Sequence, residues 1–217
     1  MSTVRQPAPP ADGALDPSGG LFERFGGADV RDLISEYPLA WILPRDGEVR
    51  EASLLPLLGE FDAQGRLTDI VGHMGRRNPL FAALSNDPRA VVLFRGPESY
   101  VSPEHAGKRD WAPTWNYAQL RIEAEVEFMP EETGAAVARL VEAMEAPRAA
   151  PWRSEELGDR YAQMERAIIG FRARVTRLTG RFKLGQDETP ETLKTIIANL
   201  PDAAMARWMR RFNAERI

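Results

Sequence analysis

The sequence predicts an α+β domain built on an antiparallel sheet or barrel, and three observations support this fold class. Residues 120–128 alternate apolar and charged side chains, which is typical of a strand with one buried face. Residues 90–94 are apolar at every position, as expected for a central strand. Five or six strand candidates alternate irregularly with helical segments such as residues 131–146, without the regular succession that predicts a parallel sheet.

Length and composition limit the class of protein. The 217 residues are enough for one large domain with a good core, and a formal net charge of −4 gives no global reason to bind nucleic acid. The chain contains no cysteine, which excludes disulfides, a thiolate nucleophile and a cysteine-based metal site. No apolar run is long enough to cross a bilayer, and no secretory signal pattern begins the sequence. We therefore expect a cytoplasmic protein without a membrane partner.

The N-terminal part of the sequence predicts an arm followed by a helix. Residues 1–20 are rich in Pro, Ala, Gly and Asp, so we expect a flexible arm. Residues 21–217 are predicted to form a single domain. Asp29 caps a short helix with one apolar stripe, and Pro38 ends it because the residue before a proline disfavours helix.

The next segments predict strands. Residues 39–43 and 52–58 are apolar runs on either side of a turn at residues 46–47, which favours a hairpin. Pro56 lies inside the second run and cannot donate to a sheet ladder, so it implies an edge, a bulge or a strand end. Residues 68–73 are a third strand candidate.

Asn78 and Pro79 mark a clear helix start, with an N-cap and a proline at the first helical position. Arg76 and Arg77 come just before it. The free N–H groups and the dipole of a helix N-terminus attract negative charge, so this region is a candidate anion site. The alternative is that both arginines face water or pair with acids.

Residues 95–117 place three prolines, two glycines, two tryptophans and two tyrosines between two strand candidates. A connection of this length predicts either a binding loop or disorder, and its aromatic content argues against disorder. We interpret it as a ligand-binding loop with Lys108, Arg109, Thr114 and Asn116 among the rings. The alternative is an ordered loop whose tryptophans fill the core.

The C-terminal half predicts four helices and one strand. Helical patterns cover residues 131–146 and 154–170, and residues 171–178 are the last strand candidate. Thr189 and Asp202 begin two further helices, so residues from about 187 to 217 form a C-terminal helical segment.

Common catalytic motifs are absent from the sequence. It has two histidines and no HExxH spacing, GxSxG elbow, Walker loop or GxGxxG fingerprint. His105 is a candidate general base or axial haem ligand, and a solvated loop histidine is the alternative. His73 ends an apolar strand, where a hydrogen-bonded structural histidine is the alternative to a ligand. No metal site is predicted.

With the common catalytic motifs absent, the remaining indication of function is a set of cationic and aromatic side chains. They suit a phosphorylated planar cofactor, because cations hold a phosphate and flat side chains cover a ring. The cations are Arg76, Arg77, Lys108 and Lys183, and the aromatic residues are Trp111, Trp115 and Tyr117.

The order of motifs resembles the PaiB family, described as FMN-binding negative transcriptional regulators with a split-barrel fold. The family's runs HLPLLL, GHxARANP, FxGPxxYISPxWY, VPTWNY, PW, AIVGIE and KLSQN have counterparts in one unbroken order. These are residues 53–58 (SLLPLL), 72–79 (GHMGRRNP), 94–105 (FRGPESYVSPEH), 112–117 (APTWNY), 151–152 (PW), 167–172 (AIIGFR) and 183–187 (KLGQD).

The resemblance implies an antiparallel six-stranded split β-barrel with peripheral helices, and a homodimer with FMN in the cleft between subunits. Pro56 would lie where a barrel strand is interrupted beside the flavin. By the same resemblance the ligand shell consists of Ser53, Leu54, Arg76, Asn78, Lys108, Thr114, Trp115, Asn116, Lys183 and Gln186.

Several positions depart from the family pattern. Glu104 and His105 replace a Trp-Tyr pair, Arg77 replaces an alanine, and Gly185 and Asp187 replace a serine and an asparagine. All of these residues are expected near the pocket. The replacements are therefore compatible with three outcomes: a changed environment of the flavin ring, a distinct substrate, or the loss of FMN binding.

The leading functional hypothesis is an FMN-dependent oxidoreductase acting on a small molecule or electron donor. Arg76 and Lys108 would neutralise the phosphate, and His105 is the candidate acid or base. One alternative is a flavin- or redox-sensing transcriptional regulator without turnover, although no helix-turn-helix signal or net positive charge supports it. The second alternative is a haem protein with His73 or His105 as axial ligand.

Overall fold

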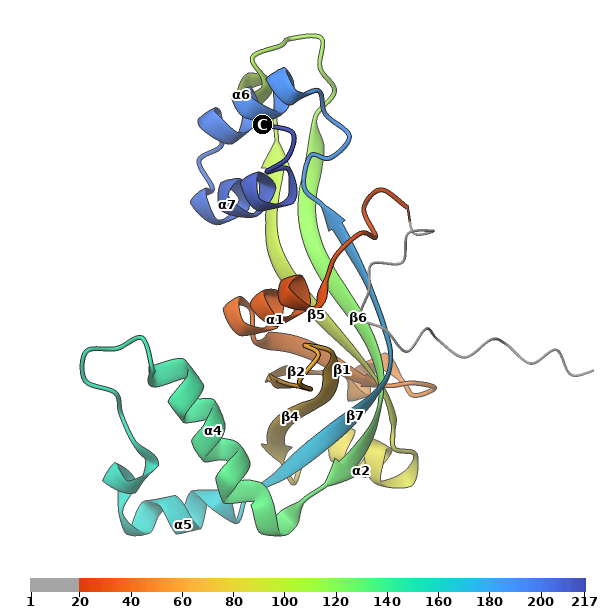
Figure 1. The fold of residues 1–217 in the computed structure, drawn as a ribbon. Helices are drawn as coiled ribbons and strands as arrows, with labels where there is room; N and C mark the ends of the chain where they lie inside the picture. Colours follow the sequence, from red (N-terminus) through yellow and green to blue (C-terminus); the bar gives the residue numbers. More distant parts are fainter. Residues whose placement is uncertain (1–19) are drawn as a thin grey trace, which may run out of the picture.

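A computed structural model describes residues 20–217, and the predicted N-terminal arm lies almost entirely outside them. One antiparallel sheet has the strand order β2-β1-β5-β6-β7-β4-β3 (Figure 1). The strands are β1 Leu39–Pro44, β2 Ser53–Pro56, β3 Leu58–Phe61, β4 Leu67–Gly75, β5 Arg89–Val101, β6 Thr114–Phe128 and β7 Ile168–Lys183. The α+β class and the antiparallel barrel are confirmed.

The sheet closes on itself between β2 and β3. These strands are at opposite edges of the strand order, yet only Leu57 separates them in the chain. Leu57 is fully buried, and its N–H donates to the carbonyl of Pro38 at 2.8 Å. The strand end predicted at Pro56 is therefore present. The predicted six strands become seven segments because the second strand along the chain is interrupted at Leu57, which divides it into β2 and β3.

Strands β5, β6 and β7 extend beyond the barrel as a three-stranded arm (Figure 1). The prediction of a loop over residues 95–117 is wrong for both of its ends, which belong to β5 and β6. The alternation was hidden by Gly96 and Pro97, since the register of β5 against β6 shifts between Arg95 and Glu98. Only residues 102–113 connect the strands, and they include the short helix α3 Pro103–Ala106.

The helices flank the barrel and the arm. Their bounds are α1 Gly27–Glu36, α2 Pro79–Asn86, α4 Thr133–Glu145, α5 Asp159–Glu165, α6 Pro190–Asn199 and α7 Ala203–Phe212, with 3₁₀ turns η1 Val49–Glu51, η2 Pro130–Glu132 and η3 Ser154–Leu157. The predicted helix over residues 154–170 is too long, because residues from Ile168 pair with β4 and begin β7. No helix within residues 20–217 is long and apolar enough to cross a membrane.

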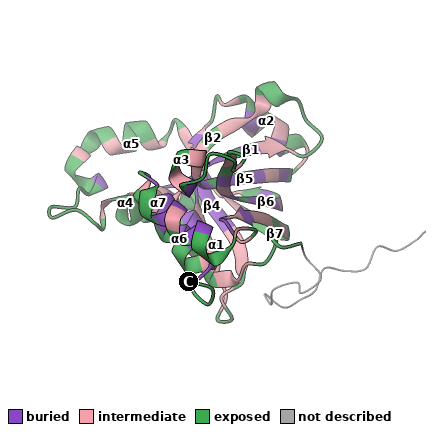
Figure 2. Ribbon diagram, turned by 90° about the horizontal axis from the view of Figure 1, so that it is seen from above, coloured by how far each residue is buried: buried purple, intermediate pink, exposed green. Residues whose placement is uncertain are grey.

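The core runs from the barrel interior into the arm. Buried residues line the strands and the inner sides of α6 and α7, whereas α5 has none (Figure 2). Trp208 of α7 is buried with Phe182 of the arm at a ring-centroid distance of 6.2 Å. Each such large apolar side chain contributes about 1.5–3 kcal/mol on burial. One face of the arm is therefore covered by the C-terminal helices.

Candidate functional site

The predicted ligand residues fall into two groups at opposite ends of β7. The barrel-end group is Ser53, Leu54, Arg76 and Asn78. The arm group is Lys108, Thr114, Trp115, Asn116, Lys183 and Gln186. Gly75, just before Arg76, pairs with the first residue of β7, while Lys183 is the last residue of that strand.

The length of β7 separates the two groups. A strand of 16 residues extends for about 50 Å along its path at about 3.3 Å per residue. Figure 1 shows α2, which follows Arg76, and the end of β7 far apart along the molecule. Arg76 and Lys183 of one chain therefore cannot hold the same mononucleotide, and neither can Arg76 and Lys108 at the tip of the arm.

Asn78 organises the barrel-end group. Its Oδ1 accepts from the N–H of Leu80 at 2.9 Å, which is the predicted N-cap of α2. The same oxygen accepts from Ser53 Oγ at 3.0 Å, so the first residue of β2 is tied to the start of the helix. The N–H of Asn78 closes a turn on the carbonyl of Gly75 at 2.9 Å. Ser53 and Asn78 thus bind each other and fix the loop that carries the arginines.

Arg76 and Arg77 are both exposed at this loop. The N–H of Arg76 donates to the carbonyl of Ala167 at 2.9 Å, which fixes the backbone. Neither guanidinium forms an ion pair with a carboxylate among residues 20–217. Two unpaired cations beside the N-terminus of α2 are suited to binding an anion.

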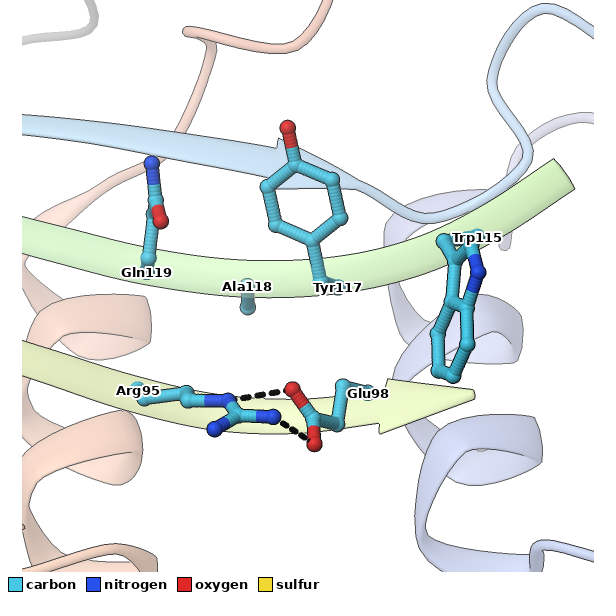
Figure 3. A pocket seen from close by; sticks show the side chains of 6 residues that line it. All are labelled: Arg95, Glu98, Trp115, Tyr117, Ala118 and Gln119. Atoms are coloured by element: carbon cyan, nitrogen blue, oxygen red, sulfur yellow. Dashed lines mark hydrogen bonds and ion pairs between the residues drawn. The ribbon is translucent and has the colours of Figure 1, made fainter. Parts of the chain in front are cut away.

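A hollow of about 380 Å³ lies on the open face of the arm (Figure 3). It is lined by Arg95, Glu98, Trp115, Tyr117, Ala118 and Gln119. Trp115 is 56% exposed, and its ring lies 5.7 Å from that of Tyr100. Arg95 and Glu98 form an ion pair across the bulge. The hollow therefore offers an exposed aromatic wall next to a polar edge.

Arg95, Glu98 and Gln119 are not among the site residues predicted from the sequence. Extending the alternation of residues 120–128 back to Trp115 would have placed Trp115, Tyr117 and Gln119 on one face. Cross-strand pairing then adds Glu98 opposite Tyr117 and Arg95 opposite Gln119.

Lys183 is a second cation beside the hollow, in addition to Arg95 of its lining. It pairs with Tyr117 in the ladder between β6 and β7, so both side chains lie on the same face. Its Nζ donates to Thr114 Oγ1, and no carboxylate among the described residues pairs with it. Of the predicted arm group, Thr114, Trp115 and Lys183 are brought together.

The other three arm residues are used for packing the C-terminal segment. Asn116 is buried on the opposite face of β6, with Nδ2 donating to Met209 Sδ at 3.5 Å. Gln186 closes the turn after β7 through 2.7 Å bonds to the carbonyl of Phe182 and the N–H of Leu184. Lys108 Nζ donates to Thr192 Oγ1 at 2.7 Å, which ties the arm tip to α6.

Neither histidine lines the hollow. His105 Nδ1 accepts from the N–H of Ser102 at 3.2 Å and so caps α3 at the arm tip. His73 pairs with Gly170 on the part of the barrel covered by α4, where the N–H of Gly170 donates to Thr133 Oγ1 at 3.0 Å. Nδ1 of His73 is buried without a partner among the described residues, and burial lowers the pKa of this imidazole.

An apolar row crosses the outer face of the barrel. Leu54, Trp41 and Leu93 are consecutive cross-strand partners on β2, β1 and β5, and they are 45%, 48% and 38% exposed. Leu39, on the same side of β1, is 52% exposed. Leu93 lies two residues before Arg95, so the apolar row continues into the hollow on the same strand. Contiguous exposed apolar side chains of this kind mark interaction surfaces.

Two curated proteins are similar to this chain in sequence. The protease synthase and sporulation protein PAI 2 of Bacillus subtilis is 24% identical over 133 residues, covering 60% of this chain and 64% of that protein. An uncharacterized protein of Aspergillus fumigatus is 26% identical over 155 residues, covering 54% of this chain and 59% of that protein. The chain thus matches less than two thirds of the length of these relatives.

Known structures share the fold. The flavocytochrome Anf3 of Azotobacter vinelandii has a TM-score of 0.52 at 12% identity, covering 73% of this chain and 68% of that one. The FAD and heme binding protein of Mycobacterium smegmatis has a TM-score of 0.52 at 16% identity, covering 72% and 70%. These similarities support the split-barrel fold alone.

A family model described as "Putative FMN-binding domain" matches residues 22–177, which is most of the chain. The match and the relative in Bacillus confirm the resemblance to PaiB-like proteins. With its split barrel and the motifs at both ends of β7, this chain belongs to that FMN-binding family.

Proposed function

We propose that two copies of this chain bind FMN between them, and that the protein uses the flavin to oxidise or reduce a small molecule. The observation that carries this proposal is the separation of the ligand residues by the length of β7. In a two-fold symmetric dimer, one end of each subunit can meet the other end of its partner. The arm group of one copy then completes the barrel-end group of the other.

The side chains present fit this cofactor. Trp115 and Tyr117 offer flat surfaces for a ring system. Lys183 supplies an unpaired cation beside the ring surface. Arg76, Arg77 and the N-terminus of α2 suit a phosphate. When bound, FMN supplies hydride or single-electron transfer, and the chain supplies binding, orientation and exclusion of water.

The apolar row supports contact with a second copy. Leu39, Trp41, Leu54 and Leu93 together expose a surface that a partner would remove from water. Burial of each side chain is worth about 1.5–3 kcal/mol before the cost of association is subtracted. Because the row continues toward the hollow along β5, the same contact would close the ligand site.

Haem binding in the hollow would need an axial ligand, and neither histidine lies there. His105 caps α3 and His73 lies under α4. A flavin-sensing regulator without turnover would use the same site as the oxidoreductase. The absorption spectrum of the purified protein distinguishes flavin from haem, and turnover with NAD(P)H or oxygen distinguishes an enzyme from a sensor.

Subunit complementation tests the composite site. One variant carries Arg76→Gln and Arg77→Gln, and the other carries Trp115→Ala and Lys183→Gln; each alone should lose FMN binding. Heterodimers isolated with two affinity tags contain one intact site and one doubly defective site. We expect them to bind about half of the wild-type amount of FMN per dimer. Heterodimers that bind none would show that each site is built within one chain, and the proposal would fail.

A further inference from the structure

Residues 20–25 form a strap along the end of β7. The N–H of Phe182 donates to the carbonyl of Phe22 at 2.7 Å, and the rings of Phe25 and Phe182 lie 4.8 Å apart. A Cβ on Gly180 would lie 2.8 Å from the ring of Phe25, so the glycine allows this close approach. The strap is thus attached to β7 by a backbone bond and by aromatic packing.

The ring of Phe22 lies over two cations of the arm. The distance from its centroid to Arg181 Cζ is 5.0 Å, and to Lys183 Nζ it is 6.0 Å. Arg181 also pairs with Glu23 of the strap at 3.7 Å, whereas Lys183 has no carboxylate partner among the described residues. Lys183 therefore lies between a hydroxyl, Thr114 Oγ1, and an aromatic face.

An aromatic face holds a cation without neutralising it. A carboxylate at the same place would attract the Lys183 ammonium more strongly, but it would cancel the charge that a ligand needs. A leucine would pack equally well but would exert no attraction through a ring quadrupole. The combination of Phe22 and Thr114 keeps the ammonium in place beside Tyr117.

We propose that Phe22 is a positioning residue, which fixes the Lys183 ammonium at the edge of the hollow for an anionic or electron-rich edge of the ligand. This inference rests on the proposed function for the identity of the ligand. The arrangement of Phe22 and Lys183 can be tested without any ligand.

The chain has three lysines, Lys108, Lys183 and Lys194, so ¹³C-dimethylation of the protein gives three lysine signals that NMR can resolve. Dimethylation retains the charge, and Lys183→Gln assigns the signal of interest. We expect ring current to shift the Lys183 signal upfield of that of exposed Lys194 in the wild type and in Phe22→Tyr. The shift should vanish in Phe22→Leu. An unchanged Lys183 signal in Phe22→Leu would overturn the proposal.

FMN titrations then measure the effect on binding. Phe22→Leu should weaken binding by roughly two- to thirty-fold, the range expected for a cation–π contact, and Phe22→Tyr should restore it. In a Lys183→Gln background, Phe22→Leu should have no further effect. Equal weakening in both backgrounds would show that Phe22 acts by packing alone.

Phe25→Leu is the matched control, because Phe25 packs on Phe182, whereas the cation–π contacts of Arg181 and Lys183 among the described residues are with Phe22. It should lower the melting temperature and leave the Lys183 signal unchanged. If the wild type binds no FMN, the proposed function fails, and the NMR comparison still decides the role of Phe22.

Discussion

Two regions of the outer barrel surface are built from the same alternating strands but carry opposite chemistry. On β6 and β7, the outward side chains form ion pairs, including Arg174 with Glu125 and Arg177 with Glu123. On β2, β1 and β5, the outward positions carry the apolar row.

This difference in side-chain chemistry indicates which of the two faces stays in contact with water and which is covered by a partner. Exposed ion pairs contribute about 0–1 kcal/mol each and stay hydrated, so the β6–β7 face is complete in a single chain. The apolar row is not covered by any other part of residues 20–217. A second copy is therefore expected on the β2–β1–β5 face, and the charged ladder disfavours the other face as an interface.

The largest effect is expected from a charged residue introduced into the apolar row. Trp41→Asp would place an unpaired carboxylate in the proposed dimer interface, so we expect dissociation to increase by a factor of at least about 100. Analytical ultracentrifugation measures the change, and circular dichroism should show an unchanged fold because Trp41 points outward. Glu125→Gln on the charged face is the control and should remain dimeric. A Trp41→Asp variant as dimeric as the wild type would contradict the assignment of the interface.

The third part of the outer surface is covered by the chain's own helix α4, and Glu60 holds it there. Glu60 pairs with both Arg139 of α4 and Arg172 of β7. Glu60→Ala leaves two arginines without their shared acceptor, so the free energy of unfolding should fall by about 1–3 kcal/mol. Urea denaturation measures this change. A smaller loss than in Glu125→Gln would show that α4 is held by packing alone.

Acid should destabilise this covered face. Burial lowers the pKa of His73, so the unfolded chain binds a proton more readily than the folded one. The free energy of unfolding has its full value above about pH 6.5, the ordinary pKa of histidine in an unfolded chain. It decreases as the pH falls from there toward the lower pKa of His73 in the folded chain. Urea denaturation at several pH values should show a decrease in this window for the wild type. His73→Gln should lose that part of the pH dependence; an unchanged profile would contradict the role of His73.

The smallest effect is expected on the charged face. Glu125→Gln removes one exposed ion pair with Arg174, so the free energy of unfolding should change by less than about 1 kcal/mol. Raising the salt concentration should reduce even this difference. A loss of several kcal/mol would show that the ladder is more than a solvated surface.

The sequence correctly predicted those helix and strand ends that are set by interactions between residues close in the chain. Asn78 and Pro79 start α2 because a side-chain cap and a fixed φ act within one turn. Pro56 ends β2 because it has no N–H for the ladder. The arm was missed because Gly96 and Pro97 shift the register, and β7 was predicted too short because pairing with β4 overrides a helical pattern.

Adjacent positions in the chain were enough to predict the family and most of the barrel strands, because motifs and alternation are local patterns. The positions of the predicted ligand residues at the two ends of β7, with Phe22 beside Lys183 and Asn116 facing the core, are visible only in the folded chain. The reason is that the register between strands distant in the chain depends on the packing of the whole sheet, which no local pattern specifies.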